Sequence, residues 1–391
     1  MRLETFALER FQSMWENRVA WNVSESGVHP LRVSELVDGP ALHDALMTQE
    51  LGYPQTNGTV ELRDAIAAMY PGATPDHVQV TNGGSEANCV VLMRLVEPGD
   101  EIVFMTPNYM QAAGLARALG ATVRPWPLRA PALSDARPAD AANRDASAAR
   151  WAPDLDELRE LVTPKTRAIL LCNPNNPTGA RLDAGTLDEV CRIAGTVGAW
   201  VVDDEIYRGA EREADDTPTV WGRYERAIVT SGLSKAYGLP GLRIGWAVAP
   251  APLVADLWSI HDYTTIAPGG INDRLARIAL EPARRATLLA RTRGIIRANY
   301  PLVRRWIEHQ EGLSHIPPEA GAIAFVRHTH PFRSSELTDR LRTERSVLLV
   351  PGDHFDMDGY FRIGFGSDPK YLESALTLIG EFLRTAGAYA R

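Results

Sequence analysis

Short apolar runs alternate with amphipathic helical stretches along most of this chain. From Glu61 onward, helical patterns separate seven such runs, which is typical of parallel strands joined by helices. This α/β pattern predicts a mainly parallel sheet flanked by helices, whose ligands bind at the C-terminal ends of the strands. The expected strands are residues 78–80, 101–105, 122–125, 168–172, 200–203, 227–230 and 246–249.

The two ends of the chain follow other patterns. Apolar residues recur irregularly between residues 3 and 19, which predicts an amphipathic helical arm. An Arg-rich helix is expected at 277–309, followed by short strands and a final helix, an order that suits a smaller α+β domain. We therefore expect an arm and part of the small domain at 1–45, a large domain at 46–275 and a small domain at 276–391.

Composition narrows the class of protein. With 391 residues, 45% of them hydrophobic, and a formal charge of -8, the chain fits a globular enzyme better than a nucleic-acid-binding protein. Cys89, Cys172 and Cys191 lack CxxC spacing, which predicts thiols in a reducing cytoplasm and neither disulfides nor a metal site. No apolar run of about 20 residues occurs, so we expect no membrane span and no signal peptide. Residues 129–153, rich in Ala, Asp, Arg and Pro, are expected to form an exposed insertion without chemistry.

The run SKAYGLPGLRIG at 234–245 carries the clearest chemistry. Lys235 follows an apolar strand pattern and lies in a Gly-rich turn, with Arg243 eight residues later. This arrangement offers an amine to an aldehyde cofactor and a cation to its phosphate. The run resembles the lysine motif of the class I/II aminotransferases, fold-type I enzymes that use pyridoxal 5'-phosphate (PLP). The alternative for Lys235 is a solvated loop lysine.

The resemblance extends to a phosphate site. The run TNGGSEA at 81–87 follows a strand and opens a helix, so its main-chain N–H groups form an anion site. The resemblance implies that the amides of Gly84, Ser85 and Glu86 bind the phosphate and that Arg243 neutralises it. Most family members carry a serine where this chain has Gly232. Ser234 or Ser231 would replace it.

Two further strand ends match the motifs that hold the cofactor ring. By this resemblance, Asn176 in the turn NPNNPTG at 173–179 would bond the phenolic oxygen. In VDDEIY at 202–207, Asp204 would pair with the ring nitrogen and Tyr207 would share the phenolic oxygen with Asn176. Tyr109, in TPNY, matches the aromatic residue stacked on the ring. Asp203 and Glu205 are the competing carboxylates, and for Glu205 we expect a charge at a helix N-terminus.

Matches also extend to the substrate and to a second subunit. Arg362, in GYFRIG, matches the arginine that clamps the substrate α-carboxylate with its guanidinium fork. Asn176 would touch the same substrate. Tyr53, in GYPQTNG, resembles the tyrosine that reaches the phosphate of the neighbouring subunit, which implies a homodimer. The arm supports this expectation, since Phe6, Phe11 and Met14 would otherwise be exposed.

One segment departs from ordinary aminotransferases. SESGVHP at 24–30 stands where they carry a Gly-Glu-Pro type turn, and it resembles capreomycidine synthase-like enzymes, which cyclise hydroxylated arginines. By this resemblance His29 would protonate a departing β-hydroxyl, with Gly27 and Glu16 at the substrate. A packed turn histidine is the alternative for His29, and His354 is a second candidate acid. Glu9, Glu16 and Glu25 would pair with a cationic side chain, or are simply exposed charges.

Two enzymatic hypotheses follow from these motifs. The first is a PLP-dependent transformation of a free α-amino acid through external aldimine and quinonoid intermediates, with β-elimination and cyclisation of a hydroxylated, arginine-like substrate in natural-product biosynthesis. The second is transfer of the amino group to a 2-oxo acid. Residues 46–275 would be the PLP-binding domain in both. A transcription regulator built on the same fold would need a helix-turn-helix module, for which residues 1–45 are too short.

Overall fold

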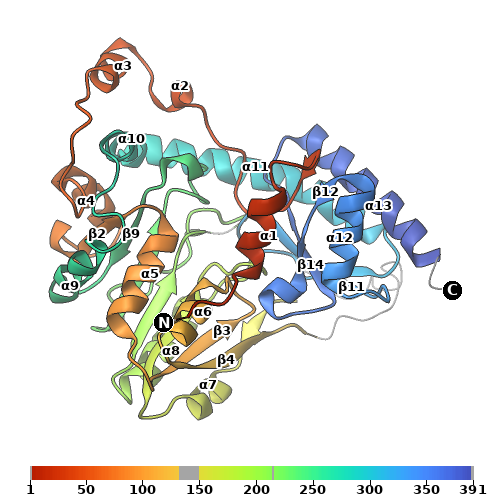
Figure 1. Cartoon of the computed structure of the whole chain (residues 1–391), viewed down its shortest axis with the longest axis horizontal. Helices are drawn as coiled ribbons and strands as arrows, with labels where there is room; N and C mark the ends of the chain where they lie inside the picture. Colours follow the sequence, from red (N-terminus) through yellow and green to blue (C-terminus); the bar gives the residue numbers. More distant parts are fainter. Residues whose placement is uncertain (1, 132–148, 214, 389–391) are drawn as a thin grey trace.

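The computed structural model describes residues 2–131, 149–213 and 215–388, and its centre is an eight-stranded sheet (Figure 1). The inner strands β3, β4, β6, β7 and β8 are parallel, while β9 runs antiparallel between β8 and β2, and β5 is antiparallel to β4. The expected mainly parallel sheet is therefore confirmed, with antiparallel strands near its edges. Its order is β2 (Val78–Thr81), β9 (Gly245–Val248), β8 (Ala227–Gly232), β7 (Trp200–Asp204), β6 (Thr166–Cys172), β3 (Glu101–Thr106), β4 (Thr122–Arg129) and β5 (Ala152–Pro153).

Helices cover both faces of this sheet, because alternate apolar side chains point to opposite sides. Ile102 and Phe104 of β3 face one core, and Val103 and Met105 face the other. The first core is closed by α5 (Gly84–Leu95), α6 (Gln111–Ala118) and α9 (Ala251–His261). The second is closed by α4 (Val60–Ala67), α7 (Leu155–Leu161), α8 (Ala184–Gly195) and α10 (Gly270–Leu280).

A second, antiparallel sheet lies toward the C-terminal end of the chain (Figure 1). Its four strands are β10 (Leu313–His315), β11 (Ile323–His328), β14 (Tyr360–Gly364) and β13 (Val350–Pro351), in that order. Three helices accompany it: α11 (Pro282–Glu308), α12 (Ser334–Arg345) and α13 (Pro369–Ala388). The single helix expected at 277–309 is wrong. The chain breaks between α10 and α11 at Glu281, because a residue before proline favours an extended backbone, and Pro282 then starts α11.

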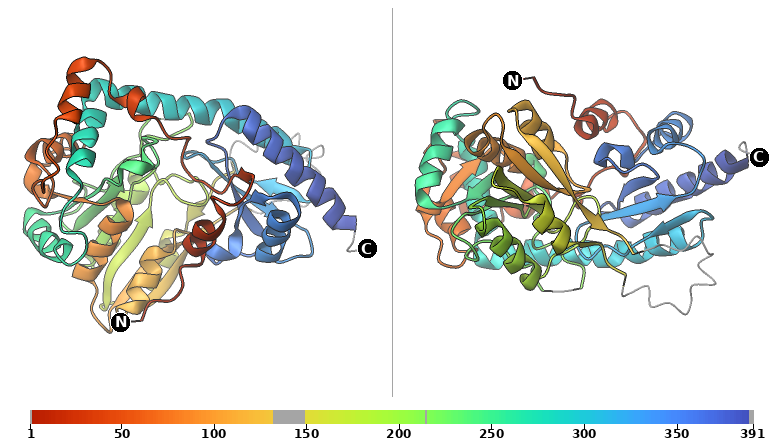
Figure 2. Two further views of the ribbon diagram at one scale, coloured as in Figure 1. Left: turned by 45° about the horizontal axis from the view of Figure 1, so that its top comes forward. Right: turned by 90° about the horizontal axis from the view of Figure 1, so that it is seen from below.

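The N-terminal segment lies between the two sheets (Figure 2). Its helix α1 (Ala7–Trp15) is shorter than the expected arm, and it leads into β1 (Trp21–Asn22), which pairs in parallel with β12 (Val347–Leu348). The chain then extends through α2 (Val33–Leu36) and α3 (Pro40–Met47), which project from the body beside α10 (Figure 1). In the ranges that the structure describes, no helix is long and apolar enough to span a membrane. The expected insertion at 129–153 lies mostly outside the described residues.

Candidate active site

The predicted residues meet where the parallel strands end, beside the antiparallel sheet. Lys235 follows β8, and its Nζ lies 3.7 Å from Oε2 of Glu25. Gly27 packs on Lys235, because a Cβ added at Gly27 would lie 3.5 Å from Lys235 Cδ. The SESGVHP turn therefore borders the lysine. Among the described residues, no group of His, Cys, Asp or Glu side chains is arranged to hold a metal ion.

The N-terminus of α5 forms an open cradle beside this lysine. Gly83 has φ +91°, and the guanidinium of Arg243 occupies the space that a side chain at Gly83 would fill. Gly245 leaves room for the same turn, since its missing Cβ would collide with the backbone of Gly83 and Gly84. Within the described ranges the amides of Gly84 and Ser85 have no hydrogen-bond partner, so they face this cradle as free donors.

Glu86 shapes the turn and has no free amide for an anion, contrary to expectation. Its N–H donates to the carbonyl oxygen of Gly83 (3.2 Å), and its carboxylate accepts from the amide of Asn82 (2.6 Å) and from Thr265 (2.8 Å). Burial opposes ionisation of Glu86, but hydrogen bonds from His261, Thr264 and Asn82 lower its pKa to about 2. The ionised side chain thus fixes the loop that carries Gly84 and Ser85.

The departure at Gly232 has a steric reason. A Cβ there would lie 2.9 Å from the carbonyl oxygen of Ile244, so β8 and its neighbour approach too closely for a serine. The hydroxyl of Ser231 donates to the carbonyl oxygen of Glu205 (3.2 Å). Ser234 is half-buried, and its hydroxyl has no partner within the described part of the chain. Of the two serines, Ser234 is the one that is free.

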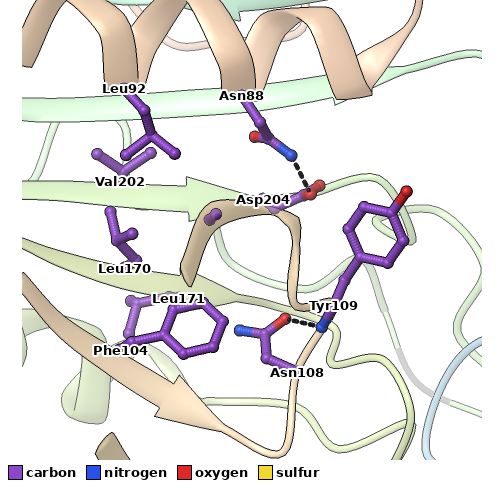
Figure 3. Close-up of a pocket in the computed structure, with 10 residues that line it drawn as sticks. Asn88, Leu92, Phe104, Asn108, Tyr109, Leu170, Leu171, Val202 and Asp204 are labelled. Atoms are coloured by element: carbon purple, nitrogen blue, oxygen red, sulfur yellow. Dashed lines mark hydrogen bonds between the residues drawn. The ribbon is translucent and has the colours of Figure 1, made fainter. Parts of the chain in front are cut away.

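Asp204, at the end of β7, opens into a small apolar pocket beside Tyr109 (Figure 3). Its Oδ2 accepts from Nδ2 of Asn88 (3.0 Å), and its Oδ1 accepts from the amide of Ile206 (3.1 Å). Burial raises the pKa of Asp204, and the two hydrogen bonds oppose that rise. Leu92, from α5, lines the apolar side of the same pocket.

The two neighbouring carboxylates point to the other face of the sheet. Asp203 is fully buried, and neither of its oxygens has a hydrogen-bond partner in the described residues; burial raises its pKa well above the usual range. The expectation that Glu205 is a charge at a helix N-terminus is wrong, because a turn follows it and its buried carboxylate accepts from Thr219 and from the amide of Val220. Burial raises the pKa of Glu205 to about 7.

Arg362 and Asn176 contact each other at the floor of the site. Arg362 is 1% exposed, and it donates from Nη1 to Oδ1 of Asn176 (2.7 Å) and from Nη2 to the carbonyl oxygen of Ser24 (2.6 Å). Its buried Nε has no partner among the described residues. Tyr207 is buried beside the same guanidinium and bonds Ser26. The arginine is thus held in place with donor capacity to spare.

Helix α1 brings carboxylates to the opposite side of the site. The hydroxyl of Tyr109 donates to Glu9 (2.8 Å), and Phe6 packs edge-on against the same ring at 4.9 Å. Burial raises the pKa of Glu16, the nearby charges of Glu25 and Glu9 raise it further, and Lys235 lowers it. The charges of Glu9, Glu25 and Lys235 therefore all act on Glu16, and Glu25 also lies beside the lysine.

The two histidine candidates differ in position. Nδ1 of His29 lies 3.1 Å from the carbonyl oxygen of Gly366, so in the neutral ring Nδ1 carries the proton and Nε2 is free. His29 is exposed, and no direct contact joins it to Lys235 in the described structure. His354 packs edge-on against Phe11 of α1 at 5.4 Å, and burial lowers its pKa. Neither histidine is placed against the lysine, although Gly27, two residues before His29, is.

Tyr53 lies apart from these residues. Its side chain is 86% exposed in the segment between α3 and α4, and in the described part of the chain no hydrogen bond or ring contact joins it to the groups above. Phe6 and Phe11, in contrast, are covered by Tyr109 and His354 of the same chain. The argument that the arm needs a second subunit to cover these two side chains is therefore wrong, whereas Met14, the third side chain of that argument, is exposed.

The motifs missed one residue that the structure brings into the site. Asn88 touches Asp204, yet it lies outside the TNGGSEA run. Its position four residues after Gly84 on a helix is the signal that would have found it, because residues four apart share a face.

Comparisons with known proteins agree on one family. The model of the family described as aminotransferase class I and II matches residues 39–379. Capreomycidine synthase of Streptomyces vinaceus is 36% identical over 373 residues, covering 93% of this chain and 90% of that protein. A PLP-dependent aminotransferase from Streptococcus suis is 32% identical with a TM-score of 0.88, covering 98% of this chain and 99% of the other. The PLP-dependent cyclase OrfR is 28% identical with a TM-score of 0.84, covering 98% of each chain.

Proposed function

The chain belongs to the aminotransferase class I and II family and is a PLP-dependent enzyme, and from this premise we propose that it cyclises a hydroxylated, arginine-like amino acid. The reaction would remove a β-hydroxyl and close a ring with a side-chain nitrogen. Similarity to capreomycidine synthase and to the cyclase OrfR supports this proposal. The coupled carboxylates beside Lys235 are the observation that carries it.

The donors and carboxylate of the described site have the chemistry that PLP requires. The free amides of Gly84 and Ser85, with Arg243 and the hydroxyl of Ser234, would hold its phosphate. Asp204 would pair with the ring nitrogen. The remaining ring contacts would come from Tyr109 on one face, and from Tyr207 and Asn176 at the phenolic oxygen.

Bound PLP supplies an electron sink that makes the Cα proton of an amino acid acidic. Arg362 would pair with the substrate carboxylate and so orient the Cα–H bond toward Lys235, which would take and return the proton. The carbonyl oxygen of Asn176 already accepts from Arg362, so its amide nitrogen is left to face the cofactor. Asn176 would thus position both partners.

Glu9, Glu16 and Glu25 would bind the cationic side chain of the substrate. The nearby charges of Glu25 and Glu9 raise the cost of ionising Glu16, and a guanidinium between the three side chains would relieve that cost. Lys235 offsets part of it before substrate binds. A substrate with a neutral or anionic side chain would find no such complement.

Ring closure balances with the loss of one water. The substrate would lose its Cα proton to Lys235 and its β-hydroxyl, which His29 would protonate as it leaves. A guanidino nitrogen would then bond to Cβ, give up a proton, and Cα would regain its own. His29 Nε2 is free to donate the proton that goes to the departing hydroxyl, because Nδ1 is fixed on the carbonyl oxygen of Gly366.

Transfer of the amino group to a 2-oxo acid is the second candidate function, and the likeness to the Streptococcus suis aminotransferase favours it. The two reactions share every cofactor contact. Incubating the holoenzyme with β-hydroxyarginine, with arginine and with a panel of common amino acids, each with and without 2-oxoglutarate or pyruvate, separates them. Cyclisation gives a product lighter by one water without any 2-oxo acid. Turnover that strictly requires a 2-oxo acid would contradict our proposal.

We also propose that the active unit is a homodimer in which Tyr53 reaches the partner's phosphate site. Tyr53, Leu51 and Tyr263 are among the most exposed large side chains of the described chain, which supports a covered surface in the assembly. The division into 1–45, 46–275 and 276–391 likewise stays a proposal, with the arm pairing to β12 in its favour. The three free cysteines are compatible with a cytoplasmic location.

A further inference from the structure

Asn88 lies on the face of α5 that looks toward Asp204 (Figure 3). It is four residues after Gly84, so one helix face carries both the free amide of the cradle and this side chain. The residue is 8% exposed, and its Nδ2 donates to Oδ2 of Asp204 at 3.0 Å. The helix α5 therefore borders the site at the cradle, through the Gly84 amide, and at Asp204, through Asn88.

A second buried residue fixes which way the Asn88 amide points. The hydroxyl of Thr230, on β8, donates to Oδ1 of Asn88 at 2.6 Å, and Thr230 is fully buried. A carboxamide accepts on one side and donates on the other, so this bond turns its NH₂ toward Asp204. The second N–H of Asn88 points to Gln111 at 3.5 Å, and Gln111 donates to the carbonyl oxygen of Ser85.

Asp204 differs from the neighbouring Asp203 in the hydrogen bonds that its carboxylate oxygens accept. One oxygen accepts from Asn88 and the other from the amide of Ile206, so each carboxylate oxygen has a donor that keeps the charge in place. Asp203, next in the chain, has no hydrogen bond to either oxygen in the described residues. Both donors to Asp204 are neutral, so they stabilise its negative charge without cancelling it.

We propose that Asn88, oriented by Thr230, is a positioning residue that aims the ionised Asp204 at the ring nitrogen of PLP. The inference rests on the role proposed above for Asp204 and adds the two residues that would hold its carboxylate in place. Without the NH₂ of Asn88, Asp204 would lose its side-chain donor and would hold a protonated ring nitrogen less firmly. A purely structural Asn88 would need the Thr230 bond but not the charge on Asp204.

The test reads the ring nitrogen of the bound cofactor directly. Holoenzyme is prepared with PLP carrying ¹⁵N in the ring, and the nitrogen chemical shift is followed against pH. For Asn88→Leu we expect the proton affinity of the ring nitrogen to fall about tenfold to a hundredfold, as for loss of one hydrogen bond to a charged group. Thr230→Val should lower it by a smaller factor, and Thr230→Ser should restore it. Thr338→Val, which removes a buried hydroxyl on α12 that bonds only the carbonyl oxygen of Ser335 in the described residues, is the control and should leave it unchanged.

A double-mutant cycle decides whether Thr230 acts through Asn88. We expect the double variant Asn88→Leu with Thr230→Val to show the same proton affinity of the ring nitrogen as Asn88→Leu alone, because Thr230 has no Asn88 amide left to orient. Additive effects, or an unchanged ring nitrogen in Asn88→Leu, would overturn the inference. If Asn88→Leu does not fold, the isosteric Thr230→Val and its serine rescue still decide. Asp204→Ala keeps the two proposals apart: a ring nitrogen unaffected by Asp204→Ala refutes the role of Asp204 itself, whereas an effect there without one at Asn88 refutes only this inference.

Discussion

Replacing Glu16 with Gln tests whether the carboxylates of the N-terminal segment recognise a cation. The change keeps the size of the side chain and removes only its charge. Glu16 is half-buried, and its raised pKa reflects burial together with Glu25 and Glu9. A charged hydrogen bond in such a place contributes about 1.5–3 kcal/mol, so kcat/KM for a guanidinium substrate should fall about tenfold to a hundredfold.

The assay compares two substrates in each variant. β-Hydroxyarginine carries a guanidinium, and the matching β-hydroxycitrulline carries a neutral urea of nearly the same shape. Only the first should lose kcat/KM in Glu16→Gln, mainly through a raised KM, because the lost attraction acts on ground state and transition state alike. Glu4→Gln is the matched control, since Glu4 lies near the same helix but pairs with the partly exposed Arg117, a contact worth little.

The raised pKa of Glu16 also predicts the direction in which KM changes with pH. Because the pKa of Glu16 is raised, the wild-type carboxylate becomes protonated at a higher pH than an ordinary glutamate as pH falls. KM for the guanidinium substrate should therefore rise on acidification in the wild type, and less steeply in Glu16→Gln. Equal losses of kcat/KM for the guanidinium and urea substrates would refute the reasoning.

Four further outcomes are expected. Borohydride reduction followed by peptide mass spectrometry should find the cofactor on Lys235, and Lys235→Ala should lose the covalently bound cofactor absorbance; labelling of another lysine would contradict the assignment. Asp204→Ala should cost far more activity than Asp203→Ala, since only Asp204 opens into the pocket, and equal losses would argue against that choice. His29→Ala should slow product formation about a hundredfold to ten-thousandfold while cofactor binding stays intact, as expected for loss of a general acid; unchanged turnover would remove His29 from the chemistry. Light scattering should give a dimer, and Tyr53→Ala should weaken PLP binding, whereas an active monomer would exclude the proposed role of Tyr53.

The sequence predicted most of the sheet because each strand is an apolar run bounded by turn residues. Lys235, Asn176 and Asp204 lie at the ends of β8, β6 and β7, and the carboxyl ends of parallel strands share one edge of a sheet. The break at Pro282 was missed because the amphipathic pattern continues across it. Periodicity alone does not register a proline at a helix start.

Side-chain direction is what the sequence left open. The amide of Glu86 fits the motif, yet it is used within the turn, and only the geometry reveals this. Glu25 approaches Lys235 because Gly364 lets the backbone of Glu25 pack against β14, a contact between residues more than 300 positions apart. Such long-range packing sets the chemistry of the site, and no local pattern encodes it.

The pairing of β1 with β12 also orders events during synthesis. Trp21 lies opposite Val347, so the N-terminal segment has no strand to join until nearly the whole chain has left the ribosome. Glu25 lies three residues after β1, so its place beside Lys235 depends on a strand made more than 300 residues later. The cradle at α5 and Lys235, in contrast, belong to the large sheet, whose strands all precede β12 in the chain.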